Sequence, residues 1–126
     1  MHVSKILIVD DILIRRSLSR TLQTDRVVLY QAGGEASARL VLSKVDLVIT
    51  SLELQEGCGL SLVASATRQR IPAILLSEDL VRLTSPEVNC VCAMGRVVAM
   101  DKPFQVTRLR DEVSRLLRRQ EVCYAY

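Results

Sequence analysis

Aromatic residues are scarce in this chain of 126 residues, which has no tryptophan, three tyrosines and one phenylalanine. Proteins that bind single-stranded nucleic acid without sequence preference usually stack the bases on several aromatic side chains. The scarcity of such side chains therefore excludes a stacking surface of that kind. The net charge of +3 is also too small to indicate binding to nucleic acid or to a membrane by itself.

Long apolar runs are also missing. The first apolar run, residues 6–9, is too short for a membrane span or a signal-peptide core, and two acids follow it directly. Hydrophobic residues make up 49% of the chain and charged residues 25%, which is typical of a globular protein. We therefore expect a cytoplasmic protein with a single domain over residues 1–126, a core at 4–120 and a short tail at 121–126.

Metal-binding residue types are few as well. The chain has one histidine, His2, and four cysteines, Cys58, Cys90, Cys92 and Cys123. Cys90 and Cys92 are separated by one residue and have no second cysteine pair, whereas zinc sites use other spacings. We interpret the cysteines as free thiols, buried or half-buried, in a reducing compartment.

The sequence does contain short apolar runs that alternate with helical patterns. The runs predict five strands, and the patterns between them predict five helical segments, one of which begins at Ser85-Pro86 and ends at Gly95. The expected strands are 5–10, 26–32, 45–50, 73–77 and 96–100, and the other expected helices are 12–23, 33–44, 59–70 and 106–120. Such alternation predicts a parallel sheet covered by helices on both faces, a three-layer α/β/α sandwich.

Ligands of such sheets bind beyond the carboxyl ends of the strands. Asp10 and Asp11 follow the first expected strand, and such oxygen ligands suit Mg²⁺. Asp11 could equally cap the following helix, and these alternatives stay open. Ser77 and Lys102 end or follow later strands. Ser77 could donate to an oxyanion, but taken singly it is better interpreted as a solvated hydroxyl. Lys102 could reach the carboxylates or a phosphoryl oxygen, and the alternative is an ordinary surface lysine before a turn.

Four segments in this order and spacing resemble the receiver domain of bacterial two-component response regulators. They are "ILIVDD" (6–11), "DLVITSLEL…GCGL" (46–60), "IPAILLS" (71–77) and "GRVVAMDKPF" (95–104). The resemblance covers nearly the whole chain. It implies the CheY-like, flavodoxin-like (βα)5 fold with strand order 2-1-3-4-5, and a role in phosphorelay signal transduction.

The resemblance also implies roles for the strand-end residues. In receivers an acid pair holds Mg²⁺, and Asp10 and Asp11 match it. A hydroxyl and a lysine contact the phosphoryl group, and Ser77 and Lys102 match them. The phosphate acceptor is an aspartate at the end of the third strand, where this chain has Ser51. A serine is a poor nucleophile without a general base. Its presence leaves two carboxylates for the metal, so we expect a weakened or lost Mg²⁺ site and a pairing of Lys102 with Asp10 or Asp11.

Other positions also depart from the family pattern. Glu78 stands where a small residue usually leaves room for the phosphoryl group, and Ala99 replaces an aromatic residue that reports the switch state. Gln55 replaces a loop proline, whereas Gly59 is kept. Glu53 lies two residues after Ser51, and its side chain could fold back to replace the missing carboxylate as a metal ligand. We expect instead a loop glutamate in solvent.

These departures predict a degenerate receiver that is not an enzyme and acts by binding a protein partner without phosphorylation. The alternative is an active phosphotransfer regulator whose acceptor is Glu53, Asp10, Asp11 or Ser51. A flavodoxin-type cofactor enzyme is rejected because no Gly-rich phosphate loop is present and Asp10-Asp11 would repel phosphate. Direct DNA binding is rejected because no residues remain for a helix-turn-helix.

Partners of receivers dock on the face formed by the fourth helix, the fifth strand and the last helix, and the resemblance implies a dimer mate, a histidine kinase or an output domain there. The polar side of the expected last helix carries five arginines. We interpret these arginines as a solvated face interleaved with Asp111 and Glu112, and the alternative is a basic docking face for an acidic partner. They are Arg108, Arg110, Arg115, Arg118 and Arg119.

Overall fold

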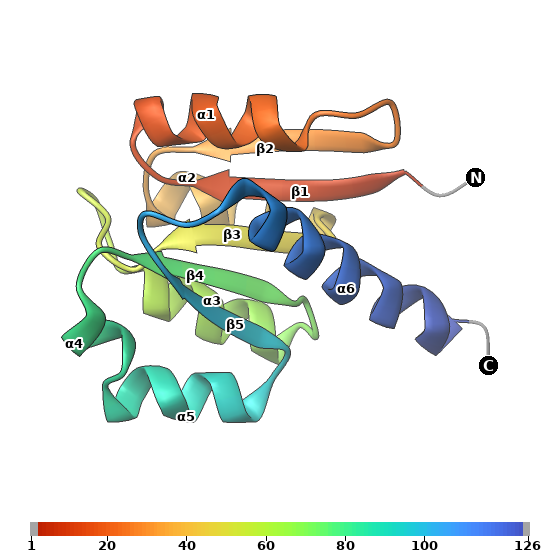
Figure 1. Ribbon diagram of the computed structural model, residues 1–126. Coiled ribbons are helices and arrows are strands. Elements are labelled where there is room, and N and C mark those ends of the chain that lie inside the picture. Colours follow the sequence, from red (N-terminus) through yellow and green to blue (C-terminus); the bar gives the residue numbers. More distant parts are fainter. Residues whose placement is uncertain (1–2, 125–126) are drawn as a thin grey trace.

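The computed structural model describes residues 3–124 of the chain and the side chains of residues 3–117. In this part of the chain five strands form one sheet, and every neighbouring pair of strands is parallel (Figure 1). The strand order is β2-β1-β3-β4-β5, as predicted. The strands are β1 (Ser4–Val9), β2 (Val27–Ala32), β3 (Leu47–Ser51), β4 (Ala73–Ser77) and β5 (Val97–Asp101).

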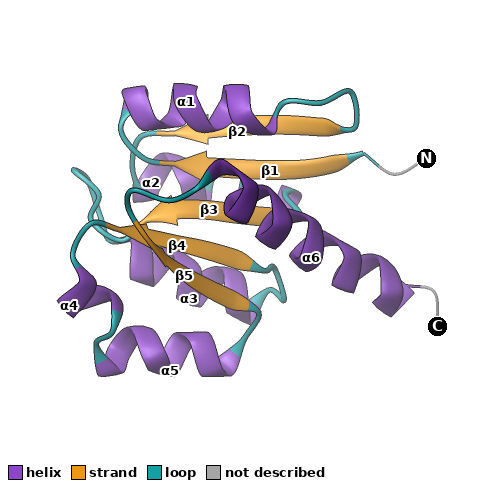
Figure 2. Ribbon diagram, viewed as in Figure 1, coloured by secondary structure: helices purple, strands orange, loops and turns teal. Residues whose placement is uncertain are grey.

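Helices cover both faces of this sheet, as the predicted three-layer sandwich requires (Figure 2). Helices α1 and α6 pack on one face, and α2, α3 and α5 pack on the other. The helices are α1 (Ile12–Leu22), α2 (Glu35–Arg39), α3 (Gly59–Arg68), α4 (Leu80–Leu83), α5 (Pro86–Met94) and α6 (Val106–Tyr124), with a 3-10 turn η1 (Leu42–Lys44).

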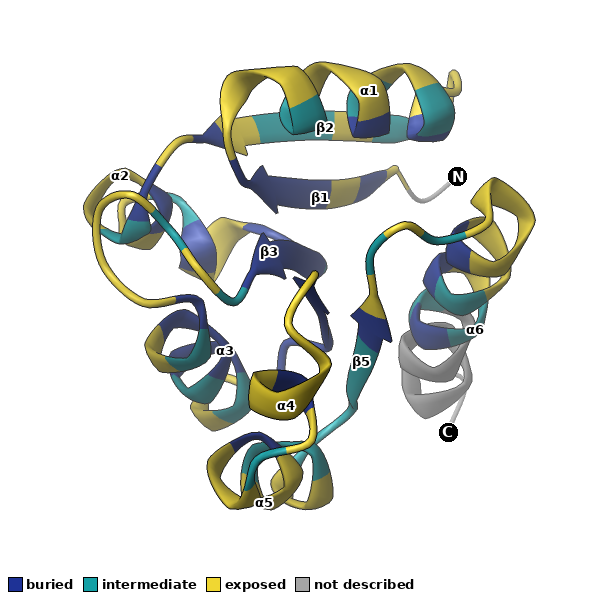
Figure 3. Cartoon of the chain, turned by 60° about the vertical axis from the view of Figure 1, so that its left-hand side comes forward, coloured by how far each residue is buried: buried dark blue, intermediate teal, exposed yellow. Residues whose placement is uncertain are grey.

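Alternating side chains of the central strands supply the two halves of the core. Ile6 and Ile8 face α1 and α6, whereas Leu7 and Val9 face α2 and α3, and all four are fully buried. Such alternation follows from the two-residue period of a strand. Strands β1 and β3 are accordingly buried along most of their length (Figure 3). Packing on both faces fixes the parallel strands side by side, so their carboxyl ends lie together at one edge of the sheet.

Local capping signals in the sequence correctly predicted one helix between β4 and β5. The hydroxyl of Ser85 accepts a hydrogen bond from the Val88 amide, Pro86 occupies the first turn of α5, and the helix ends before Gly95. These contacts satisfy amide groups that the first turn of a helix leaves without partners.

The expectation of five helical segments was wrong, because residues 78–84 contain the additional short helix α4. The carboxylate of Asp79 caps it by accepting from the Arg82 amide, and the Thr84 hydroxyl donates to the Leu80 carbonyl at its end. The expected helix over 33–44 is also divided, because hydrogen bonds between residues three apart tighten its second half into η1.

The cysteine side chains differ in part from the prediction. Cys58, Cys90 and Cys92 are free thiols, but Cys58 and Cys90 are exposed rather than buried, and Cys92 is half-buried. The side chain of Cys123 lies outside the described residues. Over the described residues, no helix is both long enough and apolar enough to cross a membrane.

Gly59 brings the first turn of α3 into contact with the end of β3. A Cβ atom at this position would lie 1.9 Å from the carbonyl oxygen of Ser51, which no side chain can tolerate. The close approach fixes where the loop after β3 leaves the sheet. Only a residue without a side chain fits here.

We predict that Gly59→Ala lowers the free energy of unfolding by about 2 kcal/mol, because the backbone of α3 must move away from β3. Denaturant unfolding measures this change. Gly33→Ala is the matched control, since the nearest atom to a Cβ there is 3.9 Å away. Equal effects of the two substitutions would contradict the assigned contact.

Candidate functional site

The ends of β1, β3, β4 and β5 bring together the residues singled out from the sequence. A hollow of about 280 Å³ opens there, and Ser77 lies next to it through its contact with Glu53. The residues that line this hollow are Asp10, Asp11, Ser51, Glu53, Glu78 and Lys102. Parallel strands of matched length produce this convergence, because their carboxyl ends all lie at the same edge.

A buried ion pair joins Lys102 to Asp10. Their Nζ and Oδ2 atoms are 2.9 Å apart, and the two side chains are 13% and 6% exposed. The other carboxylate oxygen of Asp10 accepts from the Asp11 amide at 2.8 Å, and the Lys102 amide donates to the Ser77 carbonyl at 2.8 Å. The expected pairing of Lys102 is therefore present, with Asp10 as the partner. Since β3 and β4 lie between β1 and β5, the pair spans their ends.

Asp11 has the capping role that the sequence left open. Its Oδ1 atom accepts hydrogen bonds from the amides of Leu13 and Ile14, at 3.0 and 3.1 Å. The charge also lies at the N-terminus of α1, where the helix dipole favours an anion. Asp11 is exposed and lines the hollow, but one of its oxygens is used by the helix.

Ser51 is buried at the end of β3 and is 4% exposed. Its hydroxyl donates a hydrogen bond to the backbone carbonyl of Glu53, at 3.1 Å. The proton is thus held by a carbonyl, which is too weak a base to activate the oxygen for attack. Ser51 is positioned as a structural hydroxyl of the loop that follows β3.

Glu53 and Ser77 form a contact that the sequence interpretation missed. The Ser77 hydroxyl lies 2.5 Å from Oε1 and 3.0 Å from Oε2 of Glu53, and it accepts from the Asp79 amide at 2.9 Å. Ser77 is 1% exposed, so the expected solvated hydroxyl was wrong. Glu53 is exposed, as expected of a loop glutamate, but its carboxylate folds back over the end of β4 and accepts the Ser77 hydroxyl.

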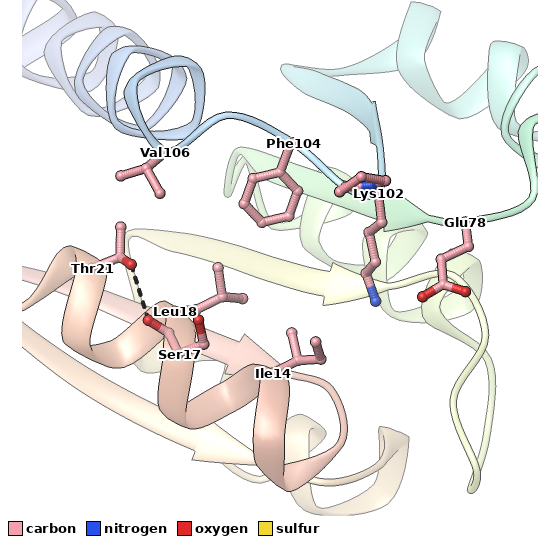
Figure 4. Close-up of a pocket in the computed structure, with 9 residues that line it drawn as sticks. Ile14, Ser17, Leu18, Thr21, Glu78, Lys102, Phe104 and Val106 are labelled. Carbon is pink, nitrogen blue, oxygen red and sulfur yellow. Dashed lines mark hydrogen bonds between the residues drawn. The ribbon is translucent and has the colours of Figure 1, made fainter.

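A second hollow of about 320 Å³ adjoins the first between α1 and the segment after β5. In Figure 4 the Lys102 side chain extends into the space between Ile14 and Glu78. The residues that line this second hollow are mainly apolar and include Leu18, Phe104 and Val106. Glu78 and Lys102 line both hollows, so a carboxylate lies on the same side of the sheet as the lysine.

The donor set does not fit a resident Mg²⁺ ion. Asp10 is neutralised by Lys102, Asp11 caps α1, and the third strand ends in a hydroxyl whose hydrogen is already donated. The carboxylate of Glu53, the remaining candidate ligand for Mg²⁺, accepts a hydrogen bond from Ser77. Among the residues that the structure describes, no three His, Cys, Asp or Glu side chains gather as metal ligands. Mg²⁺ prefers several oxygen ligands in octahedral geometry.

A cluster centred on Glu35 holds the loop after β3, and no motif in the sequence indicated it. The Glu35 carboxylate accepts from the Cys58 amide at 2.8 Å and from the Ser61 hydroxyl at 3.1 Å, and it pairs with Arg39 at 2.7 Å. The Glu35 amide donates to the Glu56 carbonyl at 2.9 Å. The Cys58 amide, and then Arg39, keep the pKa of Glu35 below its usual range.

We predict that Lys102→Met lowers the free energy of unfolding by about 3 kcal/mol, because it leaves the Asp10 carboxylate buried without its cation. Denaturant unfolding measures the change. Lys44→Met is the control, because Lys44 is exposed. In a double-mutant cycle with Asp10→Asn, the two substitutions should cost less together than the sum of their separate effects. Additive effects would show that the pair contributes nothing.

We predict that Glu35→Gln destabilises the fold at neutral pH and has a smaller effect in acid. The pKa of Glu35 is lower in the folded chain, so its ionisation stabilises the fold above the unfolded pKa. That contribution is lost as the pH falls through the folded pKa. Unfolding curves at neutral and acidic pH measure it, with exposed Glu56→Gln as the control. A pH-independent difference from wild type would contradict the assignment.

Comparisons with known proteins agree with this architecture. No protein-family model matches the sequence, and no curated protein is significantly similar to it. Among solved structures, the signal receiver domain of an HD domain-containing protein from Pseudomonas fluorescens Pf-5 is similar over 99% of this chain and 94% of its own. The TM-score is 0.82 and the sequence identity 23%.

Two further solved structures have the same fold. The chemotaxis response regulator CheY4 of Vibrio cholerae is 28% identical, with a TM-score of 0.71 over 91% of this chain and 99% of its own. NtrX from Brucella abortus is 21% identical, with a TM-score of 0.81 over 98% of this chain. The present chain spans only 29% of that NtrX chain. All three similarities are to receiver domains or to proteins that contain this fold.

Proposed function

We propose that this chain, which has the fold of a response-regulator receiver domain, is a signalling module that binds a protein partner without being phosphorylated. The observation that carries the proposal is the state of Ser51. Ser51 occupies the position at which receiver domains have the acceptor aspartate. Its hydroxyl donates a hydrogen bond to the Glu53 carbonyl. On this proposal the chain is not an enzyme and holds no resident cofactor.

Two further features support a site that does not turn over phosphate. Aspartyl phosphorylation needs a free carboxylate nucleophile and a cation to neutralise the incoming charge. Here the Lys102 ammonium is paired with Asp10, and Glu78 and Glu53 place additional negative charge around the same hollow. Repulsion between these carboxylates and a phosphoryl donor disfavours the reaction.

The proposed docking face consists of α5, β5 and the polar side of α6. On this face Met94 of α5 is 70% exposed, and Val97 and Val98 of the edge strand β5 are half-buried. An edge strand with an exposed apolar side chain beside it suits contact with another protein. A dimer mate, a histidine kinase or an output domain is the class of partner that we propose for it.

We expect the arginines of α6 to contribute less to docking than a basic patch with free charges would. Arg110 donates to the Thr21 carbonyl of α1, and Arg115 pairs with Glu112 on its own helix. Their charges are thus partly used within the chain, which agrees with the solvated-face interpretation. The side chains of Arg118 and Arg119 lie outside the described residues. We therefore place the affinity of this face in its apolar groups.

One observation favours the alternative of a rescued acceptor. The Glu53 carboxylate lies inside the site and contacts Ser77, so a carboxylate is within reach of a hydroxyl that could bind a phosphoryl oxygen. Glu53 is the strongest alternative acceptor for this reason. Asp10 is neutralised by Lys102, and Asp11 is used as a helix cap.

We predict that intact-mass spectrometry finds no adduct on the wild type after incubation with a small phosphoryl donor and Mg²⁺. Ser51→Asp is measured beside it. An adduct on this variant alone would show that the rest of the site still works once the carboxylate is restored. A base-labile adduct on the wild type would overturn the proposal in favour of Glu53, Asp10 or Asp11 as acceptor. A stable adduct would point to Ser51.

A further inference from the structure

We infer that Glu53 is an internal ligand of Ser77 that holds the segment after β4, including α4, in one conformation. This inference rests on the proposed function, because it explains how a domain without aspartyl phosphate keeps its site in a fixed state. Three contacts in series carry it, from the loop after β3 to the end of β4 and from there to α4.

The first contact joins the two loops. The Ser77 hydroxyl has a single hydrogen, and the Glu53 carboxylate receives it at 2.5 Å from Oε1 and 3.0 Å from Oε2. Hydrogen bonds to an ionised carboxylate are stronger than those between neutral groups. With Glu53 in place, Ser77 is 1% exposed, so its hydroxyl is shielded from water. Glu53 therefore determines which way the Ser77 hydroxyl points.

The second contact passes this orientation to α4. With its hydrogen given to Glu53, the Ser77 oxygen is free to accept the Asp79 amide at 2.9 Å. The Asp79 carboxylate in turn caps α4 by accepting from the Arg82 amide at 3.2 Å. The Asp79 carbonyl is a second acceptor near the Ser77 hydroxyl, but at 3.4 Å it is farther away than Glu53. The Glu53 carboxylate thus fixes the entry into α4 through Ser77 and Asp79.

The third contact keeps Glu53 in place. The loop from Leu52 to Cys58 is anchored at its far end, because Glu35 accepts from the Cys58 amide and donates its own amide to the Glu56 carbonyl. Gly57 adopts φ +91° within this loop, and a Cβ there would lie 2.3 Å from the Cβ of Glu35. The Ser51 hydroxyl fixes the near end by donating to the Glu53 carbonyl. Glu53 is therefore presented to Ser77 by a loop held on both sides.

The consequence for binding lies on α4. Leu80 and Val81 follow the capping Asp79 and are 60% and 81% exposed. Because the cap depends on Ser77, Glu53 sets how these two apolar side chains are presented. Glu53 acts through Ser77 and is a positioning residue.

The test is hydrogen exchange and the NMR amide signal of Asp79 in Glu53→Ala, with and without added acetate. We expect Asp79 to exchange at least about tenfold faster in the variant, because the oriented acceptor is lost. Acetate should restore the slower exchange and the wild-type signal, since it supplies the missing carboxylate. Glu56→Ala is the matched control, an exposed acid of the same loop, and should leave Asp79 unchanged.

Wild-type exchange of Asp79 in Glu53→Ala, or faster exchange that acetate does not reverse, would overturn the inference. Should Glu53→Ala fail to fold, the isosteric Glu53→Gln replaces it in a cycle with Ser77→Ala. We expect no further change at Asp79 when Glu53 is substituted in the Ser77→Ala background, and an additional change there would overturn the inference. Either failure leaves the mass-spectrometric result on the wild type untouched, so the two proposals fail separately.

Discussion

The ion pair between Lys102 and Asp10 is the interaction around which the carboxyl end of the sheet is organised. It connects the segments after β1 and β5 across the ends of the two strands between them, at 2.9 Å and with little exposure to water. A buried carboxylate needs a cation or hydrogen-bond donors, and Asp10 has the Lys102 ammonium together with the Asp11 amide. The remaining acids are then free for other contacts, with a helix cap for Asp11 and a serine for Glu53.

The fold could be predicted from the sequence because its signals are local. Apolar β-branched runs marked all five strands, and Ser85, Pro86 and Gly95 marked the ends of α5. The contacts of Glu35 and Glu53 could not be predicted, because each joins segments more than twenty residues apart through a side chain with no distinctive motif. Helix α4 was missed for a related reason, since it is one turn long and depends on the Asp79 cap.

Interpretation of single residues by their usual environment was least reliable at the site. A strand-end serine is normally solvated, and here Ser77 is buried and donates its hydrogen bond to the carboxylate of an exposed loop glutamate, Glu53. Asp11 shows the opposite case, because its role as a helix cap follows from its place before an amphipathic helix. The pairing of Lys102 with Asp10 was predicted through the family resemblance, whereas the tertiary contact between Glu53 and Ser77 had no such guide.

Several groups of the chain hold the loop after β3, among them Ser51, Ser77 and Glu35. On the proposed function, a loop held in this way would not report the supply of phosphoryl donors or of magnesium in the cell. A domain of this kind would convey its signal by how many copies are made and by which partner they occupy. Such a domain would be regulated by its expression level and by competition for its binding surface. The amount of partner bound would then follow the concentration of the domain.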